Sequence, residues 1–323
     1  MAVSGSTADF LPKVNHGIER GPQKPSGLND PSKLVIGSYN IRYAVGQFLI
    51  STGLLRKAGF NLPRRRAEVV AENIRQAASV FTADSLCPRV DLLALQEADK
   101  ETERAGRLHV AREMAEALEM SWVHAAAGIP RGQAPKPRQW WLDFEEQIGL
   151  YDTGDTGVAL LSHLELEDVA RIDLPWEECP WRPRLSLGAT VRVGNQQIRI
   201  FNSHIDPHPA VGGQIEQLEV VLAEADRSNA PVVLLGDFNT LSKRKCIQTR
   251  ELLESRGFAT PFPTGTATWR GAGIRLHADW IFVRDLAVTR WGVVRPLSTS
   301  DHWPIWAEIS IPQVSLRLGA LCV

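Results

Sequence analysis

Carboxylate, amide and imidazole side chains stand at the ends of the short apolar runs in this 323-residue sequence. Burying such a group beside a strand is unfavourable unless the group is paired or binds a metal. One such residue is often only a turn former. Six places of this kind in one chain indicate a shared site, because ligands gather at strand ends in α/β folds. The residues are Asn40, Glu97, His204 with Asp206, Asp237 with Asn239, Asp279, and Asp301 with His302.

The types of these residues indicate metal-assisted hydrolysis of a phosphate ester. Glu97, Asp237 and Asp301 offer hard oxygen ligands, which suit Mg²⁺ or Mn²⁺. His204 and His302 can exchange a proton near neutral pH. The sequence has no GxSxG elbow and no Gly-rich phosphate loop. We therefore expect water to attack a phosphate ester while a metal offsets the charge of the transition state.

The apolar runs predict the strands that position these residues. Near-continuous apolarity in LLAL and VVLL is typical of strands covered on both faces. Helices are indicated by apolar residues at steps of three and four, as in 64–81 and 213–226. Consecutive strands with short connections favour an α/β sandwich over a doubly wound sheet. The predicted strands are 34–41, 90–98, 156–163, 185–193, 197–205, 231–239, 278–283, 288–294 and 304–311.

Composition limits the class of protein and the organisation of the chain. Lys and Arg number 36 and Asp and Glu 37, so the net charge of −1 argues against a protein that coats nucleic acid. The four cysteines are scattered and favour reduced thiols. No secretory signal or apolar run long enough for a transmembrane helix is visible, and we expect a cytoplasmic protein. Residues 1–32 are predicted to be a flexible lead, 33–312 the single domain, and 313–323 a tail.

Seven short motifs together resemble the endonuclease/exonuclease/phosphatase superfamily, also called DNase I-like. They occur in the family's order over about residues 34–311, and in that order they are highly specific. The resemblance implies a four-layer α/β sandwich, with two packed, mixed and largely antiparallel sheets flanked by helices. The motifs are SYNIR (38–42), LQE (95–97), GVALLS (157–162), NSHID (202–206), GDFN (236–239), ADWIF (278–282) and SDH (300–302).

The resemblance also implies the roles of the site residues. Glu97 looks like the principal Mg²⁺ ligand, with Asn40 and Asp301 completing the metal neighbourhood. His302 looks like the general base, and Asp279 would hold its imidazole in the useful tautomer.

The remaining motif residues are implied to act on the substrate. Asp237 and Asn239 would face the scissile phosphate and the nucleophile. His204 would bind a phosphate oxygen and assist the leaving group, as in the DNase, sphingomyelinase and inositol-phosphatase branches. Asp206 suits a turn as well as a site.

Three departures from the family's pattern bear on the substrate. An apolar segment follows Asn40 (44–55), a basic and aromatic insert spans 130–147, and His277 precedes Asp279 where many members have Arg, Lys or Gln. The first could lie at a lipid interface or pack on a sheet edge. The second could stack a single strand or fill the core. The candidate substrate contacts are Trp140, Trp141, Trp269 and Arg244, the last within a Lys243–Lys245 basic cluster that could equally face water.

The sequence thus predicts a Mg²⁺-dependent phosphoesterase, with Mn²⁺ as the alternative metal. A phosphodiesterase that acts on single-stranded nucleic acid or on a nucleotide is favoured. The alternatives are a phospholipid or inositol-phosphate phosphoesterase of the sphingomyelinase kind, and a non-catalytic binding module with the same fold. The sequence leaves the oligomeric state open.

Overall fold

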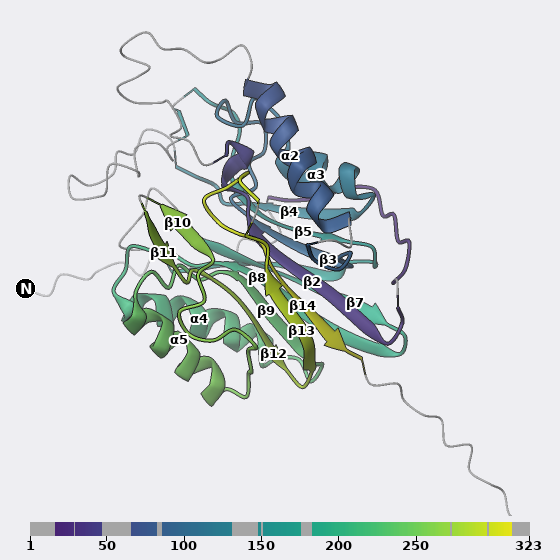
Figure 1. Cartoon of the computed structure of the whole chain (residues 1–323), viewed down its shortest axis with the longest axis vertical. Helices are drawn as coiled ribbons and strands as arrows, with labels where there is room; N and C mark the ends of the chain where they lie inside the picture. Colours follow the sequence, from purple (N-terminus) through teal and green to yellow (C-terminus); the bar gives the residue numbers. More distant parts are fainter. Residues whose placement is uncertain are drawn as a thin grey trace, which may run out of the picture.

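The computed structural model describes residues 17–28, 30–46, 66–82, 86–130, 148–149, 151–175, 183–271, 273–295 and 297–311. Two sheets pack face to face, and helices cover the outer face of each (Figure 1). This arrangement confirms the predicted four-layer α/β sandwich. No helix among these residues has the length and apolarity that crossing a membrane would require.

The first sheet has seven strands in the order β1-β4-β5-β3-β2-β14-β13. All its neighbouring strands are antiparallel except β2 and β3, which run parallel. The strands are β1 (Ile18–Arg20), β2 (Lys33–Asn40), β3 (Leu92–Gln96), β4 (Ser121–Ala126), β5 (Gly157–Ser162), β13 (Ala287–Val293) and β14 (Ile305–Ser310).

The second sheet has five strands in the order β12-β9-β8-β7-β6, with only β8 and β9 parallel. A separate two-stranded hairpin, β10 with β11, precedes β12 in the chain. The strands are β6 (Glu167–Asp173), β7 (Leu185–Val193), β8 (Gln196–His204), β9 (Val232–Asp237), β10 (Trp269–Gly271), β11 (Ile274–Leu276) and β12 (Asp279–Arg284).

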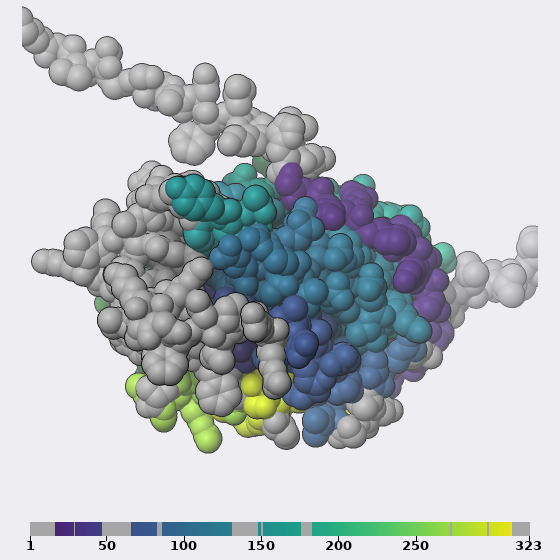
Figure 2. All heavy atoms as spheres, turned by 90° about the horizontal axis from the view of Figure 1, so that it is seen from above, coloured from purple at the N-terminus to yellow at the C-terminus, as the bar shows by residue number. Residues whose placement is uncertain are grey.

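The helices divide between the two outer faces (Figure 1). The first pair is α2 (Arg66–Thr82) and α3 (Val110–Leu118), and the second is α4 (Val211–Ala225) and α5 (Lys243–Ser255). In Figure 2 the blue residues of the first pair cover much of one face, with the purple N-terminal segment along its edge. A short left-handed turn, η1 (Arg42–Ala44), directly follows β2.

Alternating side chains on the strands build two apolar cores. Leu34 and Ile36 of β2 face the core between the sheets, whereas Val35 faces the core beneath α2 and α3. In β3, Leu92 and Ala94 face the inner core while Leu93 and Leu95 face the helices. Both faces of β3 are therefore buried, which accounts for its continuous apolar run.

The N-terminal segment differs from the prediction at one place. Residues 18–20, inside the predicted flexible lead, form β1 and pair with Val123–Ala125 at the sheet edge. Backbone hydrogen bonds to β4 hold these residues in a strand. Such bonds do not require apolar side chains, so a polar sequence does not reveal them. The predicted boundaries at 32 and 312 stay predictions, since residues 1–16 and 312–323 lie outside the described residues.

Candidate active site

The polar residues identified in the sequence converge because their strands end at the same edge of the sandwich. Asn40 and Gln96 are register partners at the ends of the parallel strands β2 and β3. His204 and Asp237 are partners at the ends of β8 and β9. The Asn40 amide donates to Asp237 Oδ2 at 2.9 Å, which links the two sheets directly at the site.

Asp237 lies at the centre of this cluster and is 1% exposed. Besides the amide of Asn40, its carboxylate accepts the backbone N–H of Asn239 at 2.9 Å. The ring nitrogens His204 Nε2 and His302 Nε2 lie 3.6 Å and 3.7 Å from its Oδ2. Burial, with the nearby charge of Asp279, raises the pKa of Asp237 to about 7 despite the opposing charge of His302.

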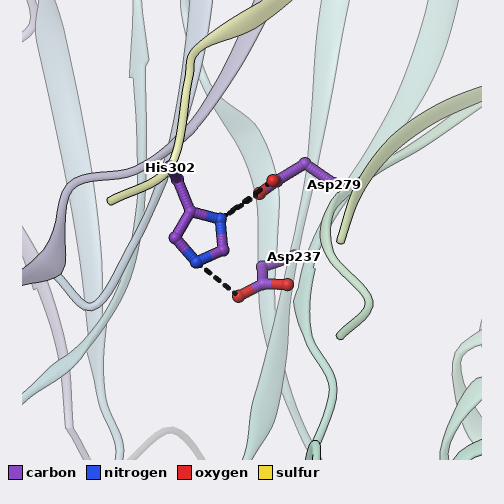
Figure 3. A group of neighbouring side chains, drawn as sticks. All are labelled: Asp237, Asp279 and His302. Atoms are coloured by element: carbon purple, nitrogen blue, oxygen red, sulfur yellow. Dashed lines mark hydrogen bonds and ion pairs between the residues drawn. The ribbon is translucent and has the colours of Figure 1, made fainter. Parts of the chain in front are cut away.

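His302 lies between two carboxylates (Figure 3). Its Nδ1 is 2.9 Å from Asp279 Oδ2, and its Nε2 points toward Asp237. Burial alone would lower the pKa of His302, but the charges of Asp279 and Asp237 outweigh it and raise the pKa to about 10. Asp279 in turn is oriented by its backbone N–H, which donates to Thr268 Oγ1 at 2.9 Å.

Glu97 and His204 form the other side of the cluster. His204 Nε2 lies 3.8 Å from Glu97 Oε1, and both side chains are largely buried. The guanidinium of Arg184 contacts the His204 ring, with Nη1 2.8 Å from Nδ1. Arg184 is 5% exposed, and its Nε and Nη2 have no hydrogen-bond partner within the described part of the chain. A buried guanidinium with free donors at a carboxylate-rich site is suited to hold an anionic oxygen.

The loop before β14 brings Asp301 to the rim of the site. Its Oδ2 accepts Trp269 Nε1 at 3.1 Å and lies 3.7 Å from Arg42 Nε. Ser300 fixes the loop by donating to the backbone carbonyl of Asn40 at 2.8 Å. Trp269 also forms a β-bridge with His302, so the β10–β11 hairpin is anchored beside the catalytic candidates.

Two of the site residues have left-handed backbone conformations. Glu97 has φ 52° and Asn239 has φ 51°, each directly after or near the end of a buried strand. Such conformations are costly for a residue other than glycine and tend to occur at functional sites. At Gly236, with φ 136°, an added Cβ would lie 2.0 Å from the carbonyl oxygen of Ser203, so only glycine fits there.

The donor set fits a divalent cation. Among the described residues, Asp237, Asp279 and His302 place one ligand atom each within 4.8 Å of one another. Glu97 adds another carboxylate, whose Oε1 lies 3.8 Å from His204 Nε2. Hard oxygen donors in this number suit Mg²⁺ or Mn²⁺. The assignment of Glu97, Asn40 and Asp301 as the ligands stays a prediction.

Other residues named from the sequence lie elsewhere. Trp140 and Trp141 lie outside the described residues. Arg244 lies in the first turn of α5, where its Nε is 3.3 Å from Gln248 Oε1. Asp206 is 1% exposed and accepts both the backbone N–H and the ring of His208, which agrees with a turn role.

Sequence reasoning missed three residues that support the site. The predicted apolar stripe of α4 includes Ile215, which is only half-buried, whereas Gln214 and Gln217 are 1% exposed. Gln214 Nε2 donates to the backbone carbonyl of Asn239, and Gln217 Oε1 accepts the N–H of Asp206. Arg184 is the third. An Arg before an apolar strand gave no signal on its own.

A family model matches most of this chain. Residues 37–302 match the model of the Endonuclease/Exonuclease/phosphatase family. No curated protein matches the sequence. The matched range includes every residue of the candidate site.

Solved structures with a similar fold were also found. An endonuclease/exonuclease/phosphatase family protein from Bacteroides thetaiotaomicron is 19% identical with a TM-score of 0.56, covering 87% of this chain and 98% of its own. The mannosyl-6-phosphatase Bt3783 of B. thetaiotaomicron VPI-5482 is 19% identical with a TM-score of 0.53, covering 86% and 100%. A humanized TDP2 from D. rerio is 17% identical with a TM-score of 0.54, covering 87% and 100%. At these identities the likeness is one of fold.

Proposed function

Since the chain belongs to the endonuclease/exonuclease/phosphatase family, whose members hydrolyse phosphoric esters, we propose that it is a Mg²⁺-dependent phosphodiesterase. The observation that carries the proposal is the Asp279–His302–Asp237 chain (Figure 3), set among further polar groups at the meeting point of both sheets. Proton transfer needs an imidazole oriented by a carboxylate, and this arrangement supplies one.

In the proposed reaction His302 acts as the general base. Asp279 binds Nδ1–H and thereby keeps Nε2 free on the side of Asp237. Nε2 would take the proton of the attacking water, which Asp237 and Asn239 orient. The amide of Asn40 and the N–H of Asn239 hold Asp237 in place for that contact.

His204 and Arg184 would bind the phosphate from the other side. Arg184 has donor nitrogens without a partner among the described residues, and His204 lies between Arg184 and the carboxylates. A guanidinium there favours the charge that develops on the phosphate oxygens and the leaving group. The buried surroundings strengthen this interaction, since water does not screen it.

A divalent cation held by Glu97, with Asn40 and Asp301 nearby, would offset the carboxylate charge, lower the pKa of His302 toward neutrality and stabilise the transition state. Mn²⁺ is the alternative ion, because it takes the same oxygen donors. The oriented imidazole and the buried guanidinium speak against a non-catalytic binding module.

We favour a nucleotide or a single-stranded nucleic acid as the substrate. The net charge of −1 means that attraction to phosphate must be local, which favours a short ligand over a long duplex. A phospholipid or inositol phosphate is the second candidate. Because one structural neighbour is named a mannosyl-6-phosphatase, a sugar phosphomonoester is also considered as a substrate. A cytoplasmic location stays a prediction from the sequence.

A substrate panel tests the proposal. Hydrolysis of bis-p-nitrophenyl phosphate, p-nitrophenyl phosphate, single-stranded DNA, a phospholipid and a phosphoinositide would be measured with Mg²⁺, with Mn²⁺ and with EDTA. We expect metal-dependent turnover, faster on the diester than on the monoester. Purified protein that hydrolyses none of these esters with either metal would refute the proposal.

A further inference from the structure

The turn η1 is the most strained stretch of backbone beside the site. Its residues Arg42, Tyr43 and Ala44 have φ values of 45°, 56° and 59°. Residues other than glycine enter this left-handed region at a cost, and they usually do so singly. Within the described ranges, no other three consecutive residues share this conformation. Such strain persists only where the surrounding contacts fix the backbone.

The turn contacts all three residues predicted to hold the cation. The backbone N–H of Arg42 donates to Asn40 Oδ1 at 3.0 Å. The backbone N–H of Tyr43 donates to the backbone carbonyl of Glu97, also at 3.0 Å. The guanidinium Nε of Arg42 lies 3.7 Å from Asp301 Oδ2. A change in the conformation of this one turn would therefore displace groups from three separate segments of the site.

Arg104 packs against the turn through an aromatic ring. Its Cζ lies 3.3 Å from the centroid of the Tyr43 ring, and such a contact is strongest where water is excluded. Asp99 accepts Arg104 Nε at 2.7 Å and Nη2 at 2.9 Å, and this bidentate pair fixes the plane of the guanidinium. Asn73 of α2 holds the end of the turn by donating to the backbone carbonyl of Ala44 at 2.8 Å.

The Arg104–Asp99 pair is fully internal, with 4% and 0% of the two residues exposed. A buried ion pair contributes little to stability, because the cost of desolvating both charges offsets their attraction. Burial alone would lower the pKa of Arg104, but the charges of Asp99, Tyr43 and Glu97 outweigh it and raise the pKa. The guanidinium is therefore a permanent charge, and its place against Tyr43 suits a geometric role.

We propose that Arg104 is a positioning residue for the cation site. Paired with Asp99, it holds the ring of Tyr43 and thereby the left-handed turn, which sets Asn40 Oδ1 and the backbone of Glu97 for the ion. The inference rests on the proposed function for the presence of the cation and for its ligands. It adds residues that act on those ligands and do not touch the substrate.

Two substitutions test the proposal by metal binding. Mn²⁺ would be titrated into metal-free protein by isothermal calorimetry. Tyr43→Leu removes the ring but leaves Arg104 paired with Asp99, so no buried charge loses its partner. Arg104→Lys keeps the charge but not the planar fork. In both variants we expect the Kd for Mn²⁺ to rise about 10–100-fold, as when other groups that orient metal ligands are changed. Tyr43→Phe keeps the ring and should keep the wild-type Kd.

Phe258→Leu is the matched control. Phe258 is a buried ring with the Cζ of Arg284 4.8 Å from its centroid, and Arg284 pairs with Asp226 at 2.6 Å. Arg284 ends β12, whereas Asp279 of the site begins it. The control therefore removes the same kind of stack at a distance from the cation. Its urea midpoint should fall while its Kd for Mn²⁺ stays that of the wild type.

A second measurement needs neither metal nor substrate. Amide hydrogen exchange at positions 42 and 43 reports the two N–H groups that bind Asn40 and Glu97. We expect exchange about tenfold faster in Tyr43→Leu and Arg104→Lys, and unchanged in Phe258→Leu. If the wild type neither binds Mn²⁺ nor hydrolyses an ester, the proposed function fails and the exchange rates alone decide the role of Arg104. Wild-type Kd or wild-type exchange in the two folded variants would overturn the proposal.

Discussion

Asp279 sets both the tautomer and the charge of His302. In Asp279→Asn the amide can present its N–H to Nδ1, which reverses the tautomer and removes a charge that raises the pKa of His302. We expect kcat for bis-p-nitrophenyl phosphate to fall about 10³–10⁴-fold. The pKa of His302, measured by NMR in metal-free protein, should fall from about 10.

The control for this change is Asp285→Asn, on the turn after β12, where the residue makes no contact with the site. Unchanged kcat in Asp279→Asn would show that the carboxylate does not orient the base. The sign of the stability effect follows from the same shift. Stability contributed by His302 is present below about pH 6.5 and is lost as the pH rises through about 10.

Arg184 is predicted to bind the phosphate directly. In Arg184→Ala we expect kcat/KM to fall about 10²-fold, the size of effect seen when a charged donor to a transition-state oxygen is removed. Arg184→Lys should recover part of the loss, since it keeps the charge but not the planar fork. Steady-state kinetics would measure kcat/KM of both variants. Urea unfolding would check that each variant is as stable as the wild type. Wild-type kcat/KM in Arg184→Ala would assign the residue to packing alone.

At the scale of elements, a buried amide joins the two sheets beneath the site. Asn202 of β8 donates to the backbone carbonyls of Leu95 and Ala159, at 2.9 Å and 2.8 Å, and accepts Gln96 Nε2 at 2.7 Å. Because all three bonds are buried, Asn202→Ala should lower the free energy of unfolding by about 2–4 kcal/mol. The urea midpoint measures this.

Asn195, exposed in the turn between β7 and β8, provides the matched control. Asn195→Ala should change the free energy of unfolding by no more than about 0.5 kcal/mol. Equal, small effects of the two substitutions would mean that the inter-sheet bonds contribute little and that apolar packing alone fixes the sheets.

The elements also show what the sequence can predict. All nine strands expected from apolar runs are present, and all except β13, which is only partly buried, have at least one buried face that requires apolar residues. Five strands were missed: β1, β4, β6, β10 and β11. Of these, β1 and β6 lie at sheet edges, where pairing rather than burial holds them, and β10 and β11 have only three residues each. The run of β4 is buried but interrupts its apolar residues with His124. The site residues at the ends of predicted strands were found because the apolar runs show where those strands end. Arg184, Gln214 and Gln217 were not, since their roles depend on contacts with distant segments.

At the scale of the whole molecule, three buried histidines should make the fold sensitive to acid. Burial lowers the pKa of His109 and of His163 to about 4, and that of His277 to about 3. In the unfolded chain these rings take up protons near pH 6.5. Stability should therefore fall as the pH decreases from about 6.5 toward 4, because the unfolded state binds protons that the folded state does not.

Urea unfolding at pH 7.5 and at pH 5.0 tests this expectation. The midpoint should be lower at pH 5.0, although Asp237 and His302, with their raised pKa values, oppose the trend. NMR should show the His277 ring still neutral at pH 5.0. A midpoint that stays constant or rises on acidification would show that the buried rings are protonated in the folded protein.

The net charge of the molecule is near zero, but its positive charge is not evenly distributed over the fold. Positive charge reaches the carboxylate cluster locally, through Arg184 beside His204 and through Arg42, whose Nε lies 3.7 Å from Asp301 Oδ2. Such local charge suits a substrate with few phosphates, and it can attract that substrate without coating the surface with cations.

The most direct test of the account is the rate of bis-p-nitrophenyl phosphate hydrolysis with Mg²⁺ in wild type and in His302→Ala. We predict metal-dependent turnover in wild type and a loss of about 10²–10⁴-fold in kcat in the variant, since the general base is removed. Circular dichroism and the urea midpoint would establish that the variant is folded. A folded His302→Ala that keeps the wild-type rate would contradict the central role given to the Asp279–His302–Asp237 chain.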